Sequence, residues 1–368
     1  MKIGIMVLSI GSFGKKGFYN LQEIGLAKAM DALCDETKVY KLVPMSEEGK
    51  EEHIEGTRHA FIRSLPSKRV GTNGVPDMEL LERDLDALIC FSDTQLMLPK
   101  VYRWAKKYHI PLFPYIGVVE SHSTNPLKKA VIDMLFLRNV AVYRKCHCFV
   151  KTLSVRERLT RAGVQGVTVV PVGLDSDLLH ADYEHVCVSK LKKKYGYREA
   201  DKVLLFIGRL IDEKQPVKMI DILAEIRQKD ASYKLLMVGT GELKDAVEAR
   251  IQKLGVQDDV QMVERIPNSD IWELYRFADA LVNLNQQEIF GMAILEAMYY
   301  GCKVVAWNAP GPNLIVESGV SGWIASNEKG IIAGIIDDKK MQEDAHLRIV
   351  EHFLWKNAAE KVFHEIAS

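Results

Sequence analysis

The sequence lacks the features that mark several large classes of protein. Basic and acidic residues number 49 each among 368, so the formal net charge is zero and no overall field attracts the chain to nucleic acid. The longest apolar runs, such as residues 203–208 and 235–239, are far shorter than the roughly 20 residues that a membrane-spanning helix needs. Because 48% of the residues are hydrophobic, disorder of the whole chain is excluded as well. We expect a globular protein with no nucleic-acid partner.

Cysteine is also scarce. The six cysteines are scattered, and only Cys146-His147-Cys148 forms a cluster. A zinc site needs about four ligands and the sequence offers no second cluster, so we favour a buried strand here and expect no metal; a metal site is the alternative. Residues 1–9 lack the cleavage site of a signal peptide and read as a buried first strand. Together with the scattered cysteines, this predicts a cytoplasmic protein.

Short apolar runs alternate with helical patterns along the whole chain, which is typical of parallel sheets joined by crossover helices. In the first half we expect strands at 2–9, 37–43, 87–91, 112–117, 148–152 and 167–171, and helices at 19–34, 77–84, 97–108 and 128–143. In the second half we expect strands at 203–208, 234–239, 260–262, 280–283 and 303–307, and helices at 216–229, 242–254, 268–277 and 292–300. Residues 341–368 read as helix. The predicted fold class is α/β, with two Rossmann-like, doubly wound domains at 1–172 and 173–351.

A glycine cluster, Gly11, Gly14 and Gly17, follows the first expected strand. Glycines let backbone N–H groups approach an anion closely at a helix N-terminus. The cluster matches neither G-x-G-x-x-G nor the P-loop, which argues against a nicotinamide dehydrogenase and a P-loop ATPase. It predicts either an anion- or substrate-binding loop or an ordinary tight turn.

Two cations follow the strand expected at 203–208. Arg209 offers a planar fork for a phosphate and Lys214 a mobile point charge. Open α/β sheets bind ligands at the carboxyl ends of their strands, so this pair suits a pyrophosphate. The alternative is a solvated loop in which the cations pair with Asp212 and Glu213.

Two carboxylates flank Gly291, where a helix is expected to begin. Glu288 precedes that helix and Glu296 lies within it, on an otherwise apolar segment. Because a carboxylate accepts hydrogen bonds from neighbouring hydroxyls, two of them here suggest sugar or ribose binding. The alternative is one acidic residue at a helix N-terminus and one on a solvated face, which Glu296 fits poorly.

These motifs together resemble the retaining glycosyltransferases of family four (glycosyl transferases group 1). The specific part is Gly208-Arg209-Leu210 with Glu213-Lys214, followed by the segment from Glu288 to Glu296. Weaker matches fall in family order over almost the whole chain: the N-terminal glycine loop and residues 171–175, 239–242, 311–312 and 319–323. The resemblance implies the GT-B fold, two Rossmann-like domains facing each other across a cleft, with a last helix at about 352–368 packing back on the first domain.

The resemblance also implies roles for single residues. Arg209 and Lys214 would hold the donor pyrophosphate and stabilise it as a leaving group. Glu296 would accept from the ribose hydroxyls, and Glu288 would hold the transferred sugar. Gly14 would approach the pyrophosphate, and Arg265 and Ile266 would border the base. The sugar would also be held by the backbone of Phe290, Gly291 and Met292. His122 would be the catalytic histidine that the first domain supplies. A satisfied loop histidine is the alternative for His122.

The acceptor side is marked only by charge. Residues 126–161 hold nine basic and two acidic residues, a net charge of +7, with apolar residues between them. This pattern predicts either a surface for anionic lipid or a core helix with a solvated basic face.

We therefore expect a retaining, metal-independent glycosyltransferase without a cofactor. It would move a hexose from a nucleotide sugar, with UDP as the default nucleotide, to a glycan or lipid-linked glycan in polysaccharide or cell-surface glycan biosynthesis. It would work in the cytoplasm, in part at the inner face of the membrane. Two other interpretations stay open: a nucleotide-sugar epimerase on the same fold, and a non-catalytic GT-B subunit that binds a glycan or a partner.

Overall fold

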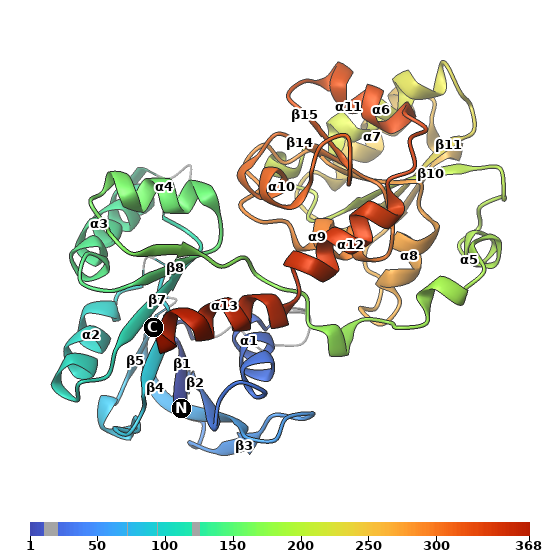
Figure 1. The fold of residues 1–368 in the computed structure, drawn as a ribbon. Helices are drawn as coiled ribbons and strands as arrows, with labels where there is room; N and C mark the ends of the chain where they lie inside the picture. The colour runs from blue at the N-terminus through green and yellow to red at the C-terminus, as the bar shows by residue number, and fades with distance from the viewer. Residues whose placement is uncertain (11–20, 72, 94, 120–125) are drawn as a thin grey trace. The chain divides into compact units, whose positions relative to one another are not determined.

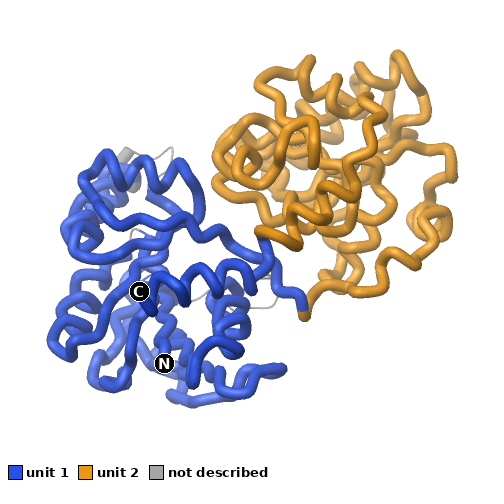
Figure 2. The backbone as a smooth tube through the Cα atoms, viewed as in Figure 1, with its two compact units in different colours: residues 1–176, 353–368 blue, residues 177–352 orange. Residues whose placement is uncertain are grey.

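The computed structural model describes residues 1–10, 21–71, 73–93, 95–119 and 126–368 (Figure 1). The chain forms two compact units, 1–176 together with 353–368, and 177–352 (Figure 2). Each unit is an α/β domain built on its own sheet. Gly14 and His122, two of the expected site residues, lie outside the described residues.

The first unit is built on a mostly parallel sheet. Its strands run in the order β3-β4-β2-β1-β6-β7-β8-β9, and β5 pairs with β4. The bounds are β1 Lys2–Val7, β2 Glu36–Pro44, β3 Glu51–His53, β4 Ala60–Val70, β5 Asn73–Pro76, β6 Ala87–Phe91, β7 Leu112–Ile116, β8 Cys148–Val150 and β9 Val167–Val169. Strand β4 pairs antiparallel with β3 and with β5, and the other strand pairings described in this sheet are parallel. The central strands are continuous apolar runs because helices cover both faces of the sheet.

Five helices belong to this unit within the described residues: α1 Gln22–Met30, α2 Leu98–Lys107, α3 Pro126–Tyr143, α4 Leu153–Arg161 and α13 Trp355–Ala367. The last of them returns to the first unit from the far end of the chain and lies beside α1 (Figure 1). Gly25 makes this contact possible, because a Cβ there would lie 2.2 Å from the Trp355 ring nitrogen. The Leu174 N–H also donates to the Phe353 carbonyl at 2.8 Å, and this bond anchors the returning chain.

The second unit has a fully parallel six-stranded sheet in the order β12-β11-β10-β13-β14-β15. Its strands are β10 Lys202–Ile207, β11 Tyr233–Val238, β12 Val260–Val263, β13 Ala280–Asn283, β14 Val304–Trp307 and β15 Trp323–Ala325. Its helices are α5 Val188–Lys194, α6 Pro216–Arg227, α7 Lys244–Leu254, α8 Ile271–Phe277, α9 Met292–Tyr299, α10 Pro310–Ile315, α11 Glu328–Ile336 and α12 Gln342–His352. Strand order reverses between β10 and β13. Such a switch point is where open α/β sheets hold their ligands.

The secondary structure differs from expectation in several places, and helices α5, α10 and α11 and strand β15 were not expected. The helix expected at 77–84 is only a short 3-10 turn, Met78–Leu80, because the chain is extended again at Leu81. The strands β3, β4 and β5 were not expected, since β3 is exposed throughout and Pro66 interrupts the apolar pattern of β4. The terminal helix is two helices, α12 in the second unit and α13 in the first, divided where Leu354 adopts an extended conformation.

No helix in the described ranges is long and apolar enough to cross a membrane.

Candidate functional site

Two glycines bring neighbouring loops together at the carboxyl edge of the second sheet. Gly208 follows β10 with φ 155°, and Gly239 follows β11 with φ 152°. A Cβ at Gly239 would lie 1.8 Å from the Gly208 carbonyl oxygen, so only glycine allows this approach. The Leu210 N–H then donates to the Thr240 carbonyl at 3.0 Å. These contacts fix the backbone on both sides of Arg209.

The central feature of the site is an ion pair between Lys214 and Glu288. The Lys214 ammonium lies 2.6 Å from a Glu288 carboxylate oxygen, and the two side chains are 25% and 15% exposed. Lys214 ends a short 3-10 turn, and Gln215 follows it in the left-handed conformation (φ 52°), which directs the chain into α6. The sequence predicts separate roles for them, Lys214 at the diphosphate and Glu288 at the sugar. The structure brings the two side chains into direct contact.

Two asparagines also donate to Glu288. The side-chain amides of Asn283, at the end of β13, and Asn285, two residues later, each lie 3.3 Å from the same carboxylate oxygen that Lys214 contacts. The Asn285 N–H is held in turn by the Asn283 side-chain oxygen at 3.0 Å. Sequence reasoning missed both asparagines. The signal for them was their place at the end of an apolar strand.

The segment after Glu288 positions the start of α9. Gly291 has φ 99°, a conformation that favours glycine, and α9 begins at the next residue, Met292. Phe290 is buried, and a Cβ at Gly311 would lie 2.1 Å from its carbonyl oxygen. The Gly311 N–H donates to the Glu288 carbonyl at 2.8 Å. The positive end of the α9 dipole therefore lies at the same sheet edge as the ion pair.

Glu296 is buried rather than solvated. Its residue is 5% exposed, and the Tyr275 hydroxyl donates to one of its carboxylate oxygens at 2.8 Å. Burial raises the pKa of Glu296 to about 7, and the bond from Tyr275 lowers it in part. The alternative of a solvated surface residue is wrong.

The remaining expected donor residues lie around this edge. Arg209 is exposed directly after β10, and Arg265 is exposed directly after β12, with Ile266 half-buried beside it. Within the part of the chain that the structure describes, neither arginine forms an ion pair. The alternative of a solvated loop that pairs with Asp212 and Glu213 is wrong for Lys214, which pairs with Glu288 instead. For Arg209 the role at the phosphate stays a prediction.

The cysteine cluster lies at the start of β8. Cys148 is buried in β8, and burial raises the pKa of the Cys146 thiol to about 12. The His147 ring lies 2.9 Å from the Thr168 hydroxyl and 3.3 Å from a Glu365 carboxylate oxygen. Among the residues described, no group of three or more His, Cys, Asp or Glu side chains could hold a metal ion.

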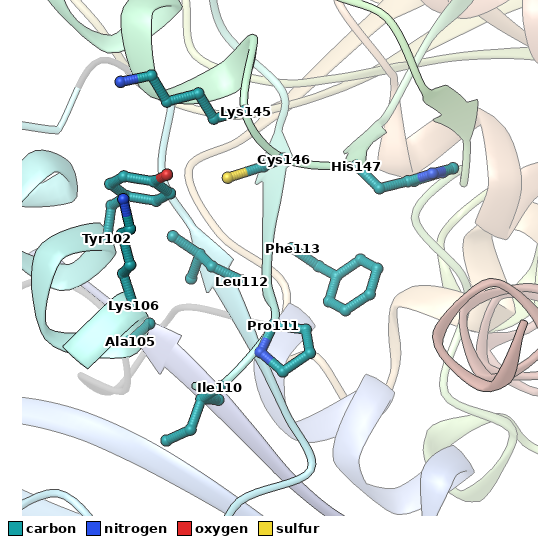
Figure 3. Close-up of a pocket in the computed structure, with 10 residues that line it drawn as sticks. All are labelled: Tyr102, Ala105, Lys106, Ile110, Pro111, Leu112, Phe113, Lys145, Cys146 and His147. Carbon is teal, nitrogen blue, oxygen red and sulfur yellow. The ribbon is translucent and has the colours of Figure 1, made fainter. Parts of the chain in front are cut away.

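A pocket of about 290 Å³ lies in the first unit, where β7 and β8 begin (Figure 3). It is lined by Tyr102, Ala105, Lys106, Ile110, Pro111, Leu112, Phe113, Lys145, Cys146 and His147. The Lys145 ammonium lies 5.8 Å from the centre of the Tyr102 ring. Because it lies at the amino ends of the strands, this pocket is at the edge opposite to the one where such sheets bind ligands.

Known proteins resemble this chain in sequence and in fold. Residues 188–349, which include Arg209, Lys214, Glu288 and Glu296, match the model of the family "Glycosyl transferases group 1". Two solved structures match the whole fold. HepE of Anabaena in complex with UDP has a TM-score of 0.71 at 17% identity, covering 100% of both chains. Sucrose-phosphate synthase of Thermosynechococcus elongatus has a TM-score of 0.72 at 15% identity, covering 99% of this chain and 98% of that one. The predicted fold class is confirmed: the chain has the GT-B fold.

Sequence relatives point the same way. An uncharacterized glycosyltransferase of Methanocaldococcus jannaschii is 24% identical over 272 residues, 69% of each chain. An alpha-monoglucosyldiacylglycerol synthase of Streptococcus pneumoniae is 22% identical over 193 residues, 52% of this chain and 44% of that protein. A D-inositol 3-phosphate glycosyltransferase of Segniliparus rotundus is 29% identical over 165 residues, 44% of this chain and 36% of that protein. The matched segments thus span less than half the length of the last two relatives. The comparisons show that the chain is similar to glycosyltransferases and that residues 188–349 match the group 1 model.

Proposed function

We propose that the protein is a retaining, metal-independent hexosyltransferase whose donor is a UDP-sugar. The observation that carries the proposal is the Lys214–Glu288 pair at 2.6 Å, at the switch point of the second sheet. The cation that would hold the diphosphate and the carboxylate that would hold the sugar hydroxyls lie side by side there, within the segment that matches the group 1 model.

The donor diphosphate would exchange partners with this pair. Its oxygens would take the Lys214 ammonium and the Arg209 guanidinium, which releases Glu288 to accept from the hydroxyls of the sugar. Asn283 and Asn285 would keep the Glu288 carboxylate in place during the exchange, because both already donate to it. Fixed cations beside the diphosphate stabilise the charge that develops when it leaves, which is usually the largest electrostatic contribution to such a step.

The nucleoside would lie at the neighbouring strand ends. The carboxylate of Glu296 would accept from the ribose hydroxyls with the oxygen that Tyr275 does not occupy. Arg265 and Ile266, which follow β12, would border the base through their main chain. The sugar would meet the backbone of Phe290, Gly291 and Met292. By the family resemblance, Gly14 would bind the pyrophosphate and His122 would bind the reacting sugar.

The reaction exchanges one bond at the anomeric carbon. Its bond to the diphosphate oxygen breaks with the electron pair on the diphosphate. The acceptor hydroxyl oxygen would bond to the same carbon with retained configuration, either by attack on the same face or through a short-lived intermediate, and the hydroxyl proton would pass to the departing phosphate oxygen. Retention rests on the family resemblance. Glu288 and Glu296 would hold hydroxyls of the sugar and the ribose, not oppose each other across a glycosidic bond as in a hydrolase.

For the acceptor we propose a glycan or lipid-linked glycan, in polysaccharide or cell-surface glycan biosynthesis. The name of the Streptococcus pneumoniae relative describes the synthesis of a glucosylated diacylglycerol, which supports a lipid-linked acceptor. We place the protein in the cytoplasm, in part at the inner face of the membrane.

Release of nucleotide from UDP-, GDP- and ADP-sugars, with and without EDTA, tests the proposal. We expect slow release of UDP from one UDP-sugar, unchanged by EDTA and abolished by Glu288→Gln. Glu328→Gln, a surface carboxylate on α11, is the matched control. The alternative is a non-catalytic subunit, which would release no nucleotide and bind none. Calorimetry with UDP on the same sample tests for this binding.

A further inference from the structure

A groove runs between the neighbouring helices α2 and α3 of the first unit. A pocket of about 610 Å³ lies between these two helices. The pocket of about 290 Å³ in Figure 3 adjoins it, because Tyr102 and Lys145 line both. Together they form one elongated groove, from Leu96 just before α2 to Pro111 just before β7. We call it the α2–α3 groove.

The α2–α3 groove is strongly basic. Among the described residues that line it, five are exposed cations and none is acidic; the five are Lys100, Arg103, Lys106, Arg138 and Lys145. Arg138 donates to the Leu96 carbonyl, and Arg103 donates to the Pro99 carbonyl at 3.3 Å. Within the described ranges, none of the five pairs with a carboxylate. Since the chain as a whole has no net charge, this is a local concentration of positive charge that favours an anion.

Tyr102 lies where the two pockets meet. It is half-buried, and the Lys145 ammonium lies 5.8 Å from the centre of its ring. His147, which also lines the groove, points away from Tyr102 in Figure 3 and lies 3.3 Å from a Glu365 carboxylate oxygen. Apolar side chains extend the surface beside the ring: Leu96, Pro99 and Val142. The groove thus offers a ligand both an apolar surface and cations.

The spacing of the cations indicates an elongated ligand. Lys100, Arg103 and Lys106 follow one another every three residues on α2, and a helix rises about 1.5 Å per residue, so neighbours are about 4.5 Å apart along its axis. Arg138 and Lys145 come from the α3 side of the groove. The two arginines offer planar forks that match carboxylates and phosphates. A small anion with a single charge would meet only part of this set.

We propose that the α2–α3 groove binds an acidic glycan, a chain of sugars that carries carboxylates or phosphates on successive units. Its anionic groups would pair with the five cations, and a sugar ring would lay its apolar C–H face on Tyr102. The combination selects this occupant, because an inorganic polyphosphate has no apolar face and a neutral glycan has no negative charge for the cations.

The inference rests on the proposed function in that the glycan would be the acceptor or product of the transferase. The groove reaches the amino ends of β7 and β8, at the edge opposite to the one where such sheets bind ligands. It would therefore hold the glycan chain at a place separate from the site of sugar transfer.

Calorimetry of the full chain with an oligomer of galacturonic acid tests the charge. The matched neutral ligand is the same oligomer with its carboxylates methyl-esterified. We expect binding of the acidic oligomer that weakens with added salt, and little or no binding of the ester. The triple variant Lys100→Gln, Arg103→Gln, Lys106→Gln should lose about tenfold or more in affinity. The control removes three exposed lysines of the second unit, Lys193→Gln, Lys229→Gln and Lys253→Gln, and should bind as the unchanged protein does.

A second pair of variants tests the aromatic surface. Tyr102→Leu should lower the affinity for the acidic oligomer by about fivefold and leave the binding of inorganic triphosphate unchanged, because only the sugar uses the ring. Tyr108→Leu is the control: this tyrosine follows α2 directly, contacts Arg83 and Lys107, and does not line the groove. Thermal unfolding on each variant should show that it is folded.

Three results would overturn the inference: equal binding of the acidic oligomer and its ester, equal loss in the triple variant and its control, or tighter binding of inorganic triphosphate or polyglutamate than of the acidic oligomer. The last result would assign the groove to a bare anion or to an acidic protein segment. UDP calorimetry on the same variants separates this inference from the proposed function, because the groove variants should bind UDP unchanged. Oligomer binding without UDP binding would reject the transferase alone, and UDP binding without oligomer binding would reject the glycan groove alone.

Discussion

The Lys214 ammonium and the Glu288 carboxylate lie 2.6 Å apart although 74 residues separate them in the chain. They meet because β10 and β13 are neighbours in the sheet, so the loops that follow these two strands share one edge. In the proposed reaction this pair opens when the donor diphosphate arrives. Each member then has a different effect when it is removed.

Removal of the cation should weaken the binding of phosphate more than that of nucleoside. We expect Lys214→Ala, alone or with Arg209→Ala, to lower the affinity for UDP by about tenfold or more and to leave uridine binding nearly unchanged. Lys218→Ala is the matched control: this lysine lies four residues further on, in α6, and its ammonium is 3.8 Å from Glu328. Calorimetry measures both ligands, and an equal loss for UDP and uridine would contradict the diphosphate role.

Removal of the carboxylate should stop turnover and spare the bare nucleotide. We expect Glu288→Gln to lose sugar transfer and donor hydrolysis by a factor of about 100 or more, because the sugar hydroxyls lose their acceptor, while UDP binds as before or more tightly. UDP release and UDP calorimetry on one sample measure the two effects. Loss of UDP binding along with turnover would show that Glu288 is needed for the nucleotide too.

Tyr275→Phe should change the pH dependence of nucleotide binding. In the proposed function the ionised Glu296 would accept from the ribose hydroxyls, so the affinity for UDP should fall as the pH drops through about 7. The hydrogen bond from Tyr275 lowers the pKa of Glu296, and its loss therefore moves this midpoint to higher pH. Tyr195→Phe, whose hydroxyl donates to Glu273 instead, is the control. A midpoint that stays in place in Tyr275→Phe would remove Tyr275 from this role.

Glu296 should also make stability depend on pH. Burial raises its pKa from 4.5 to about 7 in the folded protein, so the folded state binds the proton more tightly than the unfolded state does. The stabilisation is complete below pH 4.5 and is lost as the pH rises to about 7, with a total of about 3 kcal/mol at most. Relative to Glu296→Gln, the free energy of unfolding should therefore decrease over this range. A parallel pH dependence in the two proteins would contradict the raised pKa.

The contact between Gly208 and Gly239 should be intolerant of any side chain. Gly239→Ala places a Cβ 1.8 Å from the Gly208 carbonyl oxygen, so we expect a loss of several kcal/mol in unfolding free energy together with weaker UDP binding. Gly255→Ala is the control, because its φ is also positive, at 66°, but no atom lies within 4 Å of the added Cβ. It should cost only about 1 kcal/mol. Similar losses of unfolding free energy in both variants would mean that the close approach of Gly239 to the Gly208 carbonyl does not affect stability.

Much of the fold follows from local pattern. Continuous apolar runs such as β10 and β11, followed by longer helical periods, predict parallel strands buried on both faces. Because ligands bind at the carboxyl ends of such strands, the same pattern also indicates Arg209 and Lys214 as site residues. The strands β3, β4 and β5 could not be predicted, because exposed side chains and a proline interrupt the alternating apolar pattern of a strand. The division of the terminal helix at Leu354 could not be predicted, because the helical spacing of apolar residues continues on both sides of Leu354.

The site's contacts could not be read from the sequence, because they depend on which strands are neighbours. Lys214 reaches Glu288 only because β13 pairs with β10, while β11 and β12 lie between them in the chain. Tyr275 and Glu296 lie on different helices, α8 and α9. Asn283 and Asn285 donate to Glu288 through a loop whose shape is set by the hydrogen bond from Asn285 to Asn283. Residue types at strand ends indicate a site, and the tertiary structure decides their partners.

Proton NMR of the hydrolysis of a UDP-sugar, in the presence of EDTA, tests the central claim most directly. The account predicts that UDP and free hexose appear together, that the first anomer of the hexose has the configuration of the donor, and that Glu288→Gln produces neither. Release of the inverted anomer would contradict a retaining transferase. A donor that stays intact, with or without an added glycan acceptor, would contradict glycosyl transfer by the Lys214–Glu288 site.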